Sequence, residues 1–192
     1  MAARARNQGT IRSAEAPSAE AEKNRLISEL GDVRHRILKT AAGLGPGARD
    51  EVFLGTWSTR DLVAHLIGWD YTNTQAIDEV LAGRLPRFFE AHDRDWRTYN
   101  ALLVETYMKT VYRELLRDAR RSHRMLIERV LQTPAVDLGR DMGVRARGWK
   151  VTIERLLKAE LSDERTHLEQ LEGHASHGSR GRTIGESPQP PV

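Results

Sequence analysis

The sequence predicts an all-α protein, a four-helix bundle with a long crossover between the second and third helices. Apolar residues recur every three or four positions through four long segments, and no segment alternates convincingly with the period of two that strands require. Glycine and proline fall mostly between these segments, where they end helices. Apolar residues make up 39% of the 192 positions, which is enough for one core.

The first helix is expected over residues 21–42. Its apolar stripe consists of Leu26, Leu30, Val33, Ile37 and Ala41. The glycine-rich stretch 43–47 ends it. The segments 1–20 and 173–192 consist mostly of small and polar residues, with glycine and proline among them. We expect both to be disordered tails on either side of a single domain, residues 21–172.

The second helix begins within the segment GTWSTRDLVAHLIGWD, residues 55–70. Ser58 is the predicted N-cap, and Asp61 stands three residues later, as in a capping box. Trp57 and Leu62 have the spacing of a hydrophobic staple around this cap. The helix should run to about Leu81, before the stretch 83–86 stops it.

The third helix is expected over residues 93–131, with a bend or a change of packing partner near 110–114. The reason is that its apolar stripe shifts round the helix by roughly 100° at that point. The fourth helix is expected over residues 150–172, after a loop rich in glycine and arginine.

Composition excludes several classes of function. The chain has no cysteine, so disulfides and thiol nucleophiles are excluded, and a metal site must use His, Asp or Glu. No apolar run is long enough for a membrane span, and the first 25 residues lack the apolar core of a secretory signal, so we expect a cytoplasmic protein. A net charge of +3 among 57 charged side chains is not a nucleic-acid footprint.

Three metal-capable residues fall on or beside inward helix faces. His65 lies on the apolar face of the second helix, and Asp163 and His167 stand four apart on the fourth. Two imidazoles and a carboxylate suit Zn, Ni, Fe or Mn and leave a coordination position open. The alternative for His65 is a hydrogen-bonded core histidine, and the alternative for Asp163 is a solvated surface acid.

Two further acids, Glu160 and Glu164, fall inside the apolar arc of the fourth helix. Burial of such groups is costly unless they are paired or bind a metal. Either could act as a general base, or orient a metal ligand from behind.

The segment from Trp57 to Leu66 resembles the W-S-x-x-(D/E)-x-x-x-H-(L/I) opening of helix two in the DinB-like superfamily of four-helix bundles. The continuation through residues 65–86 and 93–100 is most similar to its ClbS/DfsB branch. The resemblance implies a metal site of one histidine in helix two and an H-x-x-x-H pair in helix four. His65 and His167 match two of these positions, and Asp163 replaces the third. Some relatives in that branch do without the metal.

Three functions therefore compete. The first is a metal-dependent hydrolase or thiol transferase that acts on a small reactive or toxic molecule, with any thiol supplied as a low-molecular-weight cofactor; the branch contains a hydrolase that opens a cyclopropane on a genotoxin. The second is a metal-free protein that binds or sequesters such a molecule in a pocket. The pocket candidates, each of which could equally be core packing, are Trp69, Asn73, Trp96, Tyr99 and Asn100.

The third function is nucleic-acid binding through the basic loop 140–150, which we consider unlikely because a solvated surface loop explains those charges as well. The sequence leaves a homodimer open.

Overall fold

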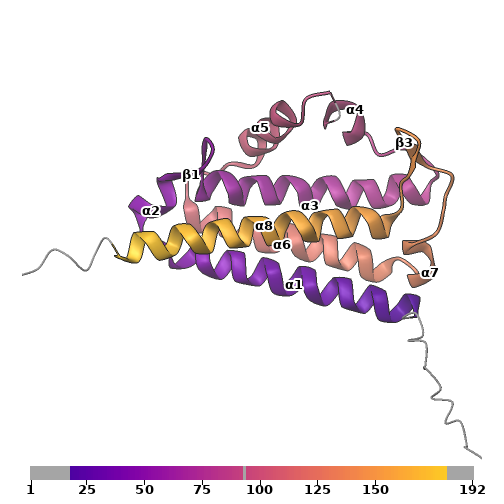
Figure 1. The fold of residues 1–192 in the computed structure, drawn as a ribbon, viewed down its shortest axis with the longest axis horizontal. Coiled ribbons are helices and arrows are strands. Elements are labelled where there is room, and N and C mark those ends of the chain that lie inside the picture. Colours follow the sequence, from indigo (N-terminus) through magenta and orange to yellow (C-terminus); the bar gives the residue numbers. More distant parts are fainter. Residues whose placement is uncertain (1–17, 93, 181–192) are drawn as a thin grey trace, which may run out of the picture.

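The all-α prediction is confirmed by a computed structural model that describes residues 18–92 and 94–180 (Figure 1). The helices are α1 (Ala19–Gly43), α2 (Pro46–Asp50), α3 (Thr59–Leu81), α4 (Phe88–His92), α5 (Trp96–Tyr107), α6 (Tyr112–Gln132), α7 (Ala135–Leu138) and α8 (Ile153–Arg180). Two short antiparallel hairpins, which the sequence did not predict, are β1 (Val52–Leu54) with β2 (Trp57–Ser58) and β3 (Arg145–Ala146) with β4 (Trp149–Lys150).

Four long helices, α1, α3, α6 and α8, lie side by side (Figure 1). Helices α1 and α8 run in one direction and α3 and α6 in the other. After α3 the chain returns along its outer side through α4 and α5 before α6 begins. Each long helix packs on two others, which gives the order α1, α8, α3, α6 around the group.

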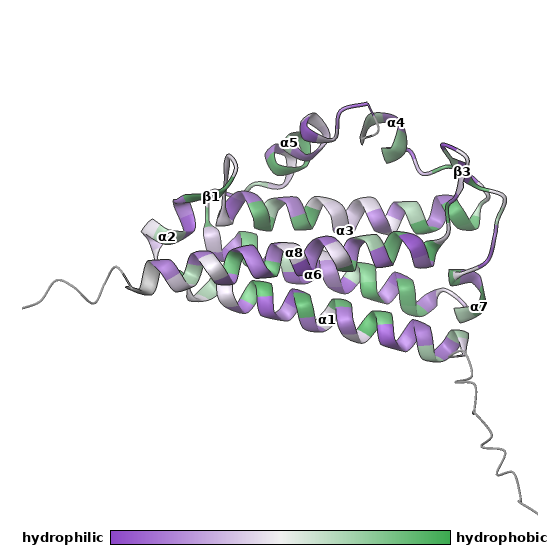
Figure 2. Ribbon diagram, viewed as in Figure 1, coloured by the Kyte–Doolittle hydropathy of each residue, from purple (hydrophilic) through white to green (hydrophobic). Residues whose placement is uncertain are grey.

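Apolar residues recur along each long helix between hydrophilic ones (Figure 2), and those facing the centre form one core. Its fully buried members include Leu26, Leu30, Ile37, Leu62, Ile77, Leu115, Leu126, Leu157 and Leu171. Burial of such aliphatic side chains contributes roughly 1.5–3 kcal/mol each. The core thereby fixes the faces from which the polar residues described below project.

The start of α3 follows the predicted capping box. The Oγ atom of Ser58 accepts a hydrogen bond from the backbone N–H of Asp61, and the Asp61 carboxylate accepts one from the backbone N–H of Ser58. The ring of Trp57, the residue before this cap, lies against that of His65, with 4.7 Å between ring centroids.

The third predicted helix is in fact two helices. Residues 108–111 are not helical, so the expected bend is a complete break between α5 and α6. Helix α5 packs on the outside of α3, where Gly68 permits the close approach: a Cβ atom there would lie 2.7 Å from the Cβ of Leu103. The drift of the apolar stripe thus marks two helices with different packing partners.

The ends of the first and last helices also differ from expectation. Helix α1 begins at Ala19, where Ser18 accepts a hydrogen bond from the N–H of Ala21, rather than at residue 21. Helix α8 begins at Ile153 rather than 150 and continues to Arg180, so residues 173–180 are helical instead of part of a tail. His174 holds this extension by stacking on Phe53 and bonding the carbonyl of Ala48. The remainder of both expected tails lies outside the described residues.

Candidate metal centre

His65 is buried in α3, but among the described residues neither of its ring nitrogens has a hydrogen-bond partner. Its ring contacts the ring of Trp57 and lies 5.3 Å from the ring of His167, at nearly a right angle. Its Nε2 atom lies 3.7 Å from Oδ2 of Asp163, within ion-pair range but too long for a hydrogen bond. A buried polar group without a partner costs about 1–3 kcal/mol, so His65 does not behave as a satisfied core histidine.

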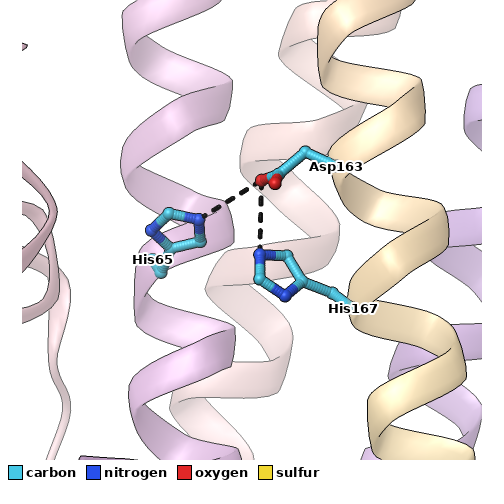
Figure 3. Close-up of side chains that lie close together, drawn as sticks. All are labelled: His65, Asp163 and His167. Carbon is cyan, nitrogen blue, oxygen red and sulfur yellow. Dashed lines mark ion pairs between the residues drawn. The ribbon is translucent and has the colours of Figure 1, made fainter. Parts of the chain in front are cut away.

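Asp163 and His167 project from consecutive turns of α8 toward His65. Figure 3 shows the carboxylate of Asp163 between the two imidazoles, with ion pairs to both. The Nε2 atom of His167 lies 3.2 Å from Oδ2 of Asp163, and its Nδ1 atom lies 3.1 Å from Oε1 of Gln170. Gln170 therefore sets the orientation of the His167 ring, which leaves Nε2 on the side of the other two residues.

The surroundings push the pKa values of the two histidines apart. Burial lowers the pKa of His65, although the carboxylate of Asp163 opposes this effect. Burial also opposes the protonation of His167, but the hydrogen bond with Asp163 outweighs it and raises the pKa of His167. Burial likewise works against ionisation of Asp163, yet the two histidines beside it hold its pKa well below its usual range. The carboxylate is thus ionised and His65 neutral, as metal ligands require, whereas the raised pKa of His167 means that an ion must displace a proton from it.

The three side chains fit a divalent ion. One potential ligand atom from each lies within 4.8 Å of the others. A tetrahedral Zn²⁺ site with bonds of about 2.0–2.1 Å places ligand atoms about 3.3 Å apart, close to the two distances from the Asp163 carboxylate. The side chain of Asp163 is 56% exposed, so this side of the cluster faces solvent. The cluster could therefore hold a metal ion with a coordination position left open.

The acids Glu160 and Glu164 lie in the core rather than beside these three residues. Glu160 accepts a hydrogen bond of 2.8 Å from the side-chain amide of Asn73, and Glu164 accepts one of 2.5 Å from Arg34. In the described part of the chain, neither pairs with His65, Asp163 or His167. Burial raises the pKa of Glu160 well above its ordinary value, which favours the protonated form of this carboxyl group.

A buried charged network, which the sequence analysis missed, joins all four long helices. Arg34 of α1 donates two hydrogen bonds to Asp70 of α3, at 2.7 and 3.1 Å, besides the one to Glu164 of α8. From α6, Ser122 donates a 2.6 Å hydrogen bond to Asp70, and Nδ1 of His123 lies 3.5 Å from it. The signal was present in the sequence, because Arg34 falls between Leu30 and Ile37 on the apolar stripe of α1.

Asp70, His123 and Glu164 also bring metal-capable atoms within 4.8 Å of one another. Here, however, the guanidinium of Arg34 already supplies the positive charge. Burial opposes the ionisation of Asp70, but the charge of Arg34 favours it, and the pKa of Asp70 is lowered as a result. This second cluster is therefore better described as a buried ion-pair network than as a metal centre.

The five predicted pocket residues do not lie together in the structure. Trp69 donates a 3.1 Å hydrogen bond to the side-chain carbonyl of Asn100, and the hydroxyl of Tyr99 bonds to that of Thr72, so these residues tie α5 to α3. Asn73 points into the core toward Glu160, as described above. Trp96 lies apart from them, 52% exposed, with the guanidinium of Arg97 over its ring.

Two cavities flank α5. One, with a volume of about 250 Å³, lies between α3, α4 and α5, and its lining includes Thr72, Phe88 and Tyr99. The other, of about 390 Å³, is lined by residues that include Trp57 and Val104. None of the three candidate metal ligands lines either cavity, and Trp57 is the residue that both faces one of them and contacts His65.

The basic loop forms the β3–β4 hairpin and pairs most of its charges internally. Asp141 binds Arg145 through two hydrogen bonds and lies 3.2 Å from Lys150, while Arg140 pairs with Asp137. Charges neutralised within the loop are not available to hold phosphates.

No family model, curated protein sequence or solved structure matches the chain. Among the described residues, every helix is too short or too polar to cross a lipid bilayer.

Proposed function

We propose that this protein is a divalent-metal-binding enzyme with a DinB-like four-helix bundle, of the ClbS/DfsB kind, that acts on a small reactive or toxic molecule. The reaction is a hydrolysis or a transfer of a low-molecular-weight thiol. The observation that carries the proposal is the convergence of His65, Asp163 and His167, with both ring nitrogens of a buried histidine lacking partners.

The arrangement supports the proposal in two further ways. The His65 position and the pair four residues apart agree with the superfamily pattern, with Asp163 in place of one histidine, and a carboxylate is a competent ligand for Zn, Ni, Fe or Mn. The long connection through α4 and α5 also agrees with the predicted crossover.

A bound ion would supply Lewis-acid activation of a water or of the sulfhydryl of a thiol cosubstrate. His65, Asp163 and His167 would hold the ion, and Gln170 would fix the ring of His167 from behind. Since the chain has no cysteine, the thiol must come from solution. The exposed side of Asp163 is the route by which a substrate would reach the ion.

A second candidate is a metal-free protein that sequesters its small molecule beside α5. The two cavities there, lined in part by aromatic residues, favour it. In this case Trp57 and Tyr99 would contact the molecule, and His65 would support Trp57.

Isothermal titration of zinc and nickel into the chelator-treated protein tests the proposal. Wild type should bind one equivalent, and His65→Ala and His167→Ala should each abolish binding. His177→Ala is the matched control, because His177 is exposed on the same helix as His167 and should leave binding unchanged. Asp163→His should bind more tightly than wild type, since imidazole is the better ligand for these borderline metals.

The outcomes separate the two candidates. If wild type takes up neither metal and Asp163→His alone creates a site, the enzyme proposal fails and the metal-free candidate replaces it. If His177→Ala weakens binding as much as His65→Ala does, the metal binds surface histidines and the proposed site is wrong.

A further inference from the structure

A third cavity of ligand size lies between α1 and α6, on the side of the helix group away from the candidate metal centre. Its volume is about 460 Å³, within the usual range of small-molecule sites. Its apolar lining comes from Leu38 and Ala42, and Gly31 widens it, because a Cβ atom at Gly31 would meet no atom within 4 Å.

The polar lining of this cavity is entirely basic. It consists of Arg34, His35, Lys39, Arg120, His123 and Arg124, and no carboxylate of residues 18–92 or 94–180 lines it. Arg34 is neutralised by Asp70 and Glu164 in the core. In contrast, Lys39 and Arg124 form no ion pair or hydrogen bond within residues 18–92 and 94–180, and Arg120 reaches only a carbonyl of its own helix, at 3.5 Å.

This arrangement is unfavourable without a ligand. Like charges four residues apart on a helix, such as Arg120 and Arg124, destabilise it, and Lys39 adds a third charge from the facing helix. An anion that bridges the two helices would remove this repulsion. The cavity thus has a charged rim and an apolar wall, the combination that binds an organic anion.

A buried histidine provides the second, independent observation. His123 is only 8% exposed and lines the cavity, and neither of its ring nitrogens has a hydrogen-bond partner in the part of the chain that the structure describes. Asp70 lies on its Nδ1 side, at 3.5 Å. A buried imidazole in this state is explained if a ligand in the cavity completes its bonding.

We propose that the α1–α6 cavity binds a small organic anion. The carboxylate or phosphate group of the anion lies among Lys39, Arg120 and Arg124 and bonds to His123, and its apolar part packs on Leu38 and Ala42. This site shares no residue with the candidate metal centre and does not depend on the proposed function.

Calorimetric titration with phenyl phosphate and with benzoate tests the proposal and separates the two anionic groups. Inorganic phosphate is the charge-only comparison and benzyl alcohol the apolar-only comparison. At least one of the two organic anions should bind at one equivalent with a Kd of roughly 1 mM or below, at least about tenfold tighter than either comparison compound. The histidine Cε1–H resonance most strongly shifted on binding should be that of His123.

Two variants confine the effect to the cavity. Gly31→Leu, which fills the cavity, and Arg124→Glu, which reverses one rim charge, should each weaken binding by at least about tenfold. Arg121→Glu is the matched control, because Arg121 is exposed on the same helix and does not line the cavity; it should leave binding unchanged. Circular dichroism confirms that the variants fold.

The proposal is overturned if neither organic anion binds saturably, or if inorganic phosphate binds as tightly as both. It is also overturned if Arg121→Glu weakens binding as much as Arg124→Glu, since general surface charge then explains the affinity. Insensitivity to Gly31→Leu would place the anion outside the cavity and refute the proposal as well.

Discussion

Replacement of Arg34 by methionine should destabilise the protein severely. The guanidinium is 1% exposed and is the shared donor for Asp70 and Glu164, through three hydrogen bonds of 2.5–3.1 Å. Methionine keeps the length of the side chain but removes the charge and all three bonds. The fully buried carboxylates of Asp70 and Glu164 then remain in the core without the guanidinium that paired with both.

The magnitude follows from the network's burial. Loss of one partner of a buried ion pair costs about 3–5 kcal/mol, because the remaining charge is left without compensation. Protonation of the carboxylates limits the cost to this range rather than to the sum of three charge-assisted hydrogen bonds, which would be roughly 4.5–9 kcal/mol. For a protein of this length, about 3–5 kcal/mol corresponds to a fall in Tm of roughly 6–20 °C.

Urea denaturation followed by circular dichroism measures the effect. Arg36→Met is the matched control, because Arg36 lies two residues away, 58% exposed in a surface pair with Glu172, and its loss should cost at most about 1 kcal/mol.

The pH dependence gives a second check. Although burial opposes this effect, Arg34 and His123 lower the pKa of Asp70 in wild type. Asp70 therefore contributes to the stability of the fold at pH values above its pKa in the unfolded chain. Without Arg34, burial raises that pKa, and the variant loses stability as pH rises through it. The difference in unfolding free energy between wild type and variant should therefore increase from about pH 5 to about pH 8. A difference below about 1 kcal/mol at neutral pH, equal to that of Arg36→Met, would refute the network's role.

Three further changes have defined outcomes. Ser58→Ala should cost about 1 kcal/mol through loss of the capping box with Asp61, measured by urea denaturation; no change would mean that the cap contributes nothing. Gly68→Ala should cost about 1–3 kcal/mol because its Cβ would meet the Cβ of Leu103, and Leu103→Gly, which removes that atom, should remove the penalty in the double variant; additive costs would contradict the contact. Glu160→Gln should gain stability relative to wild type as pH rises, because burial raises the pKa of Glu160 and wild type loses stability as pH rises through that value; a pH-independent difference would contradict this.

The sequence predicted the long helices because their apolar stripes have the helical period over many turns. It predicted Ser58 as a cap because the capping box is local. It did not predict that α5 and α6 are separate, since a change of packing partner and a bend produce the same drift of the stripe. The end of α8 depends on His174 and Phe53, which meet across more than a hundred residues, so local composition alone suggested a tail.

The candidate site divides in the same way. The spacing of Asp163 and His167 was enough to predict that they act together, and the place of His65 on the buried face of α3 was enough to add it to the site. The positions of Glu160 and Glu164 could not be predicted, because Arg34 and Asn73, which hold them, come from other helices. His123 lies beside Asp70 of another helix for the same reason, and the sequence shows no partner for it.

The metal content of the protein tests the central claim most directly. Wild type and His65→Ala should be purified side by side without an affinity tag or chelator and measured by elemental analysis. The account predicts close to one equivalent of zinc, nickel, iron or manganese in wild type and a small fraction of that in His65→Ala. Wild-type protein free of these metals, or equal metal content in both proteins, would contradict it.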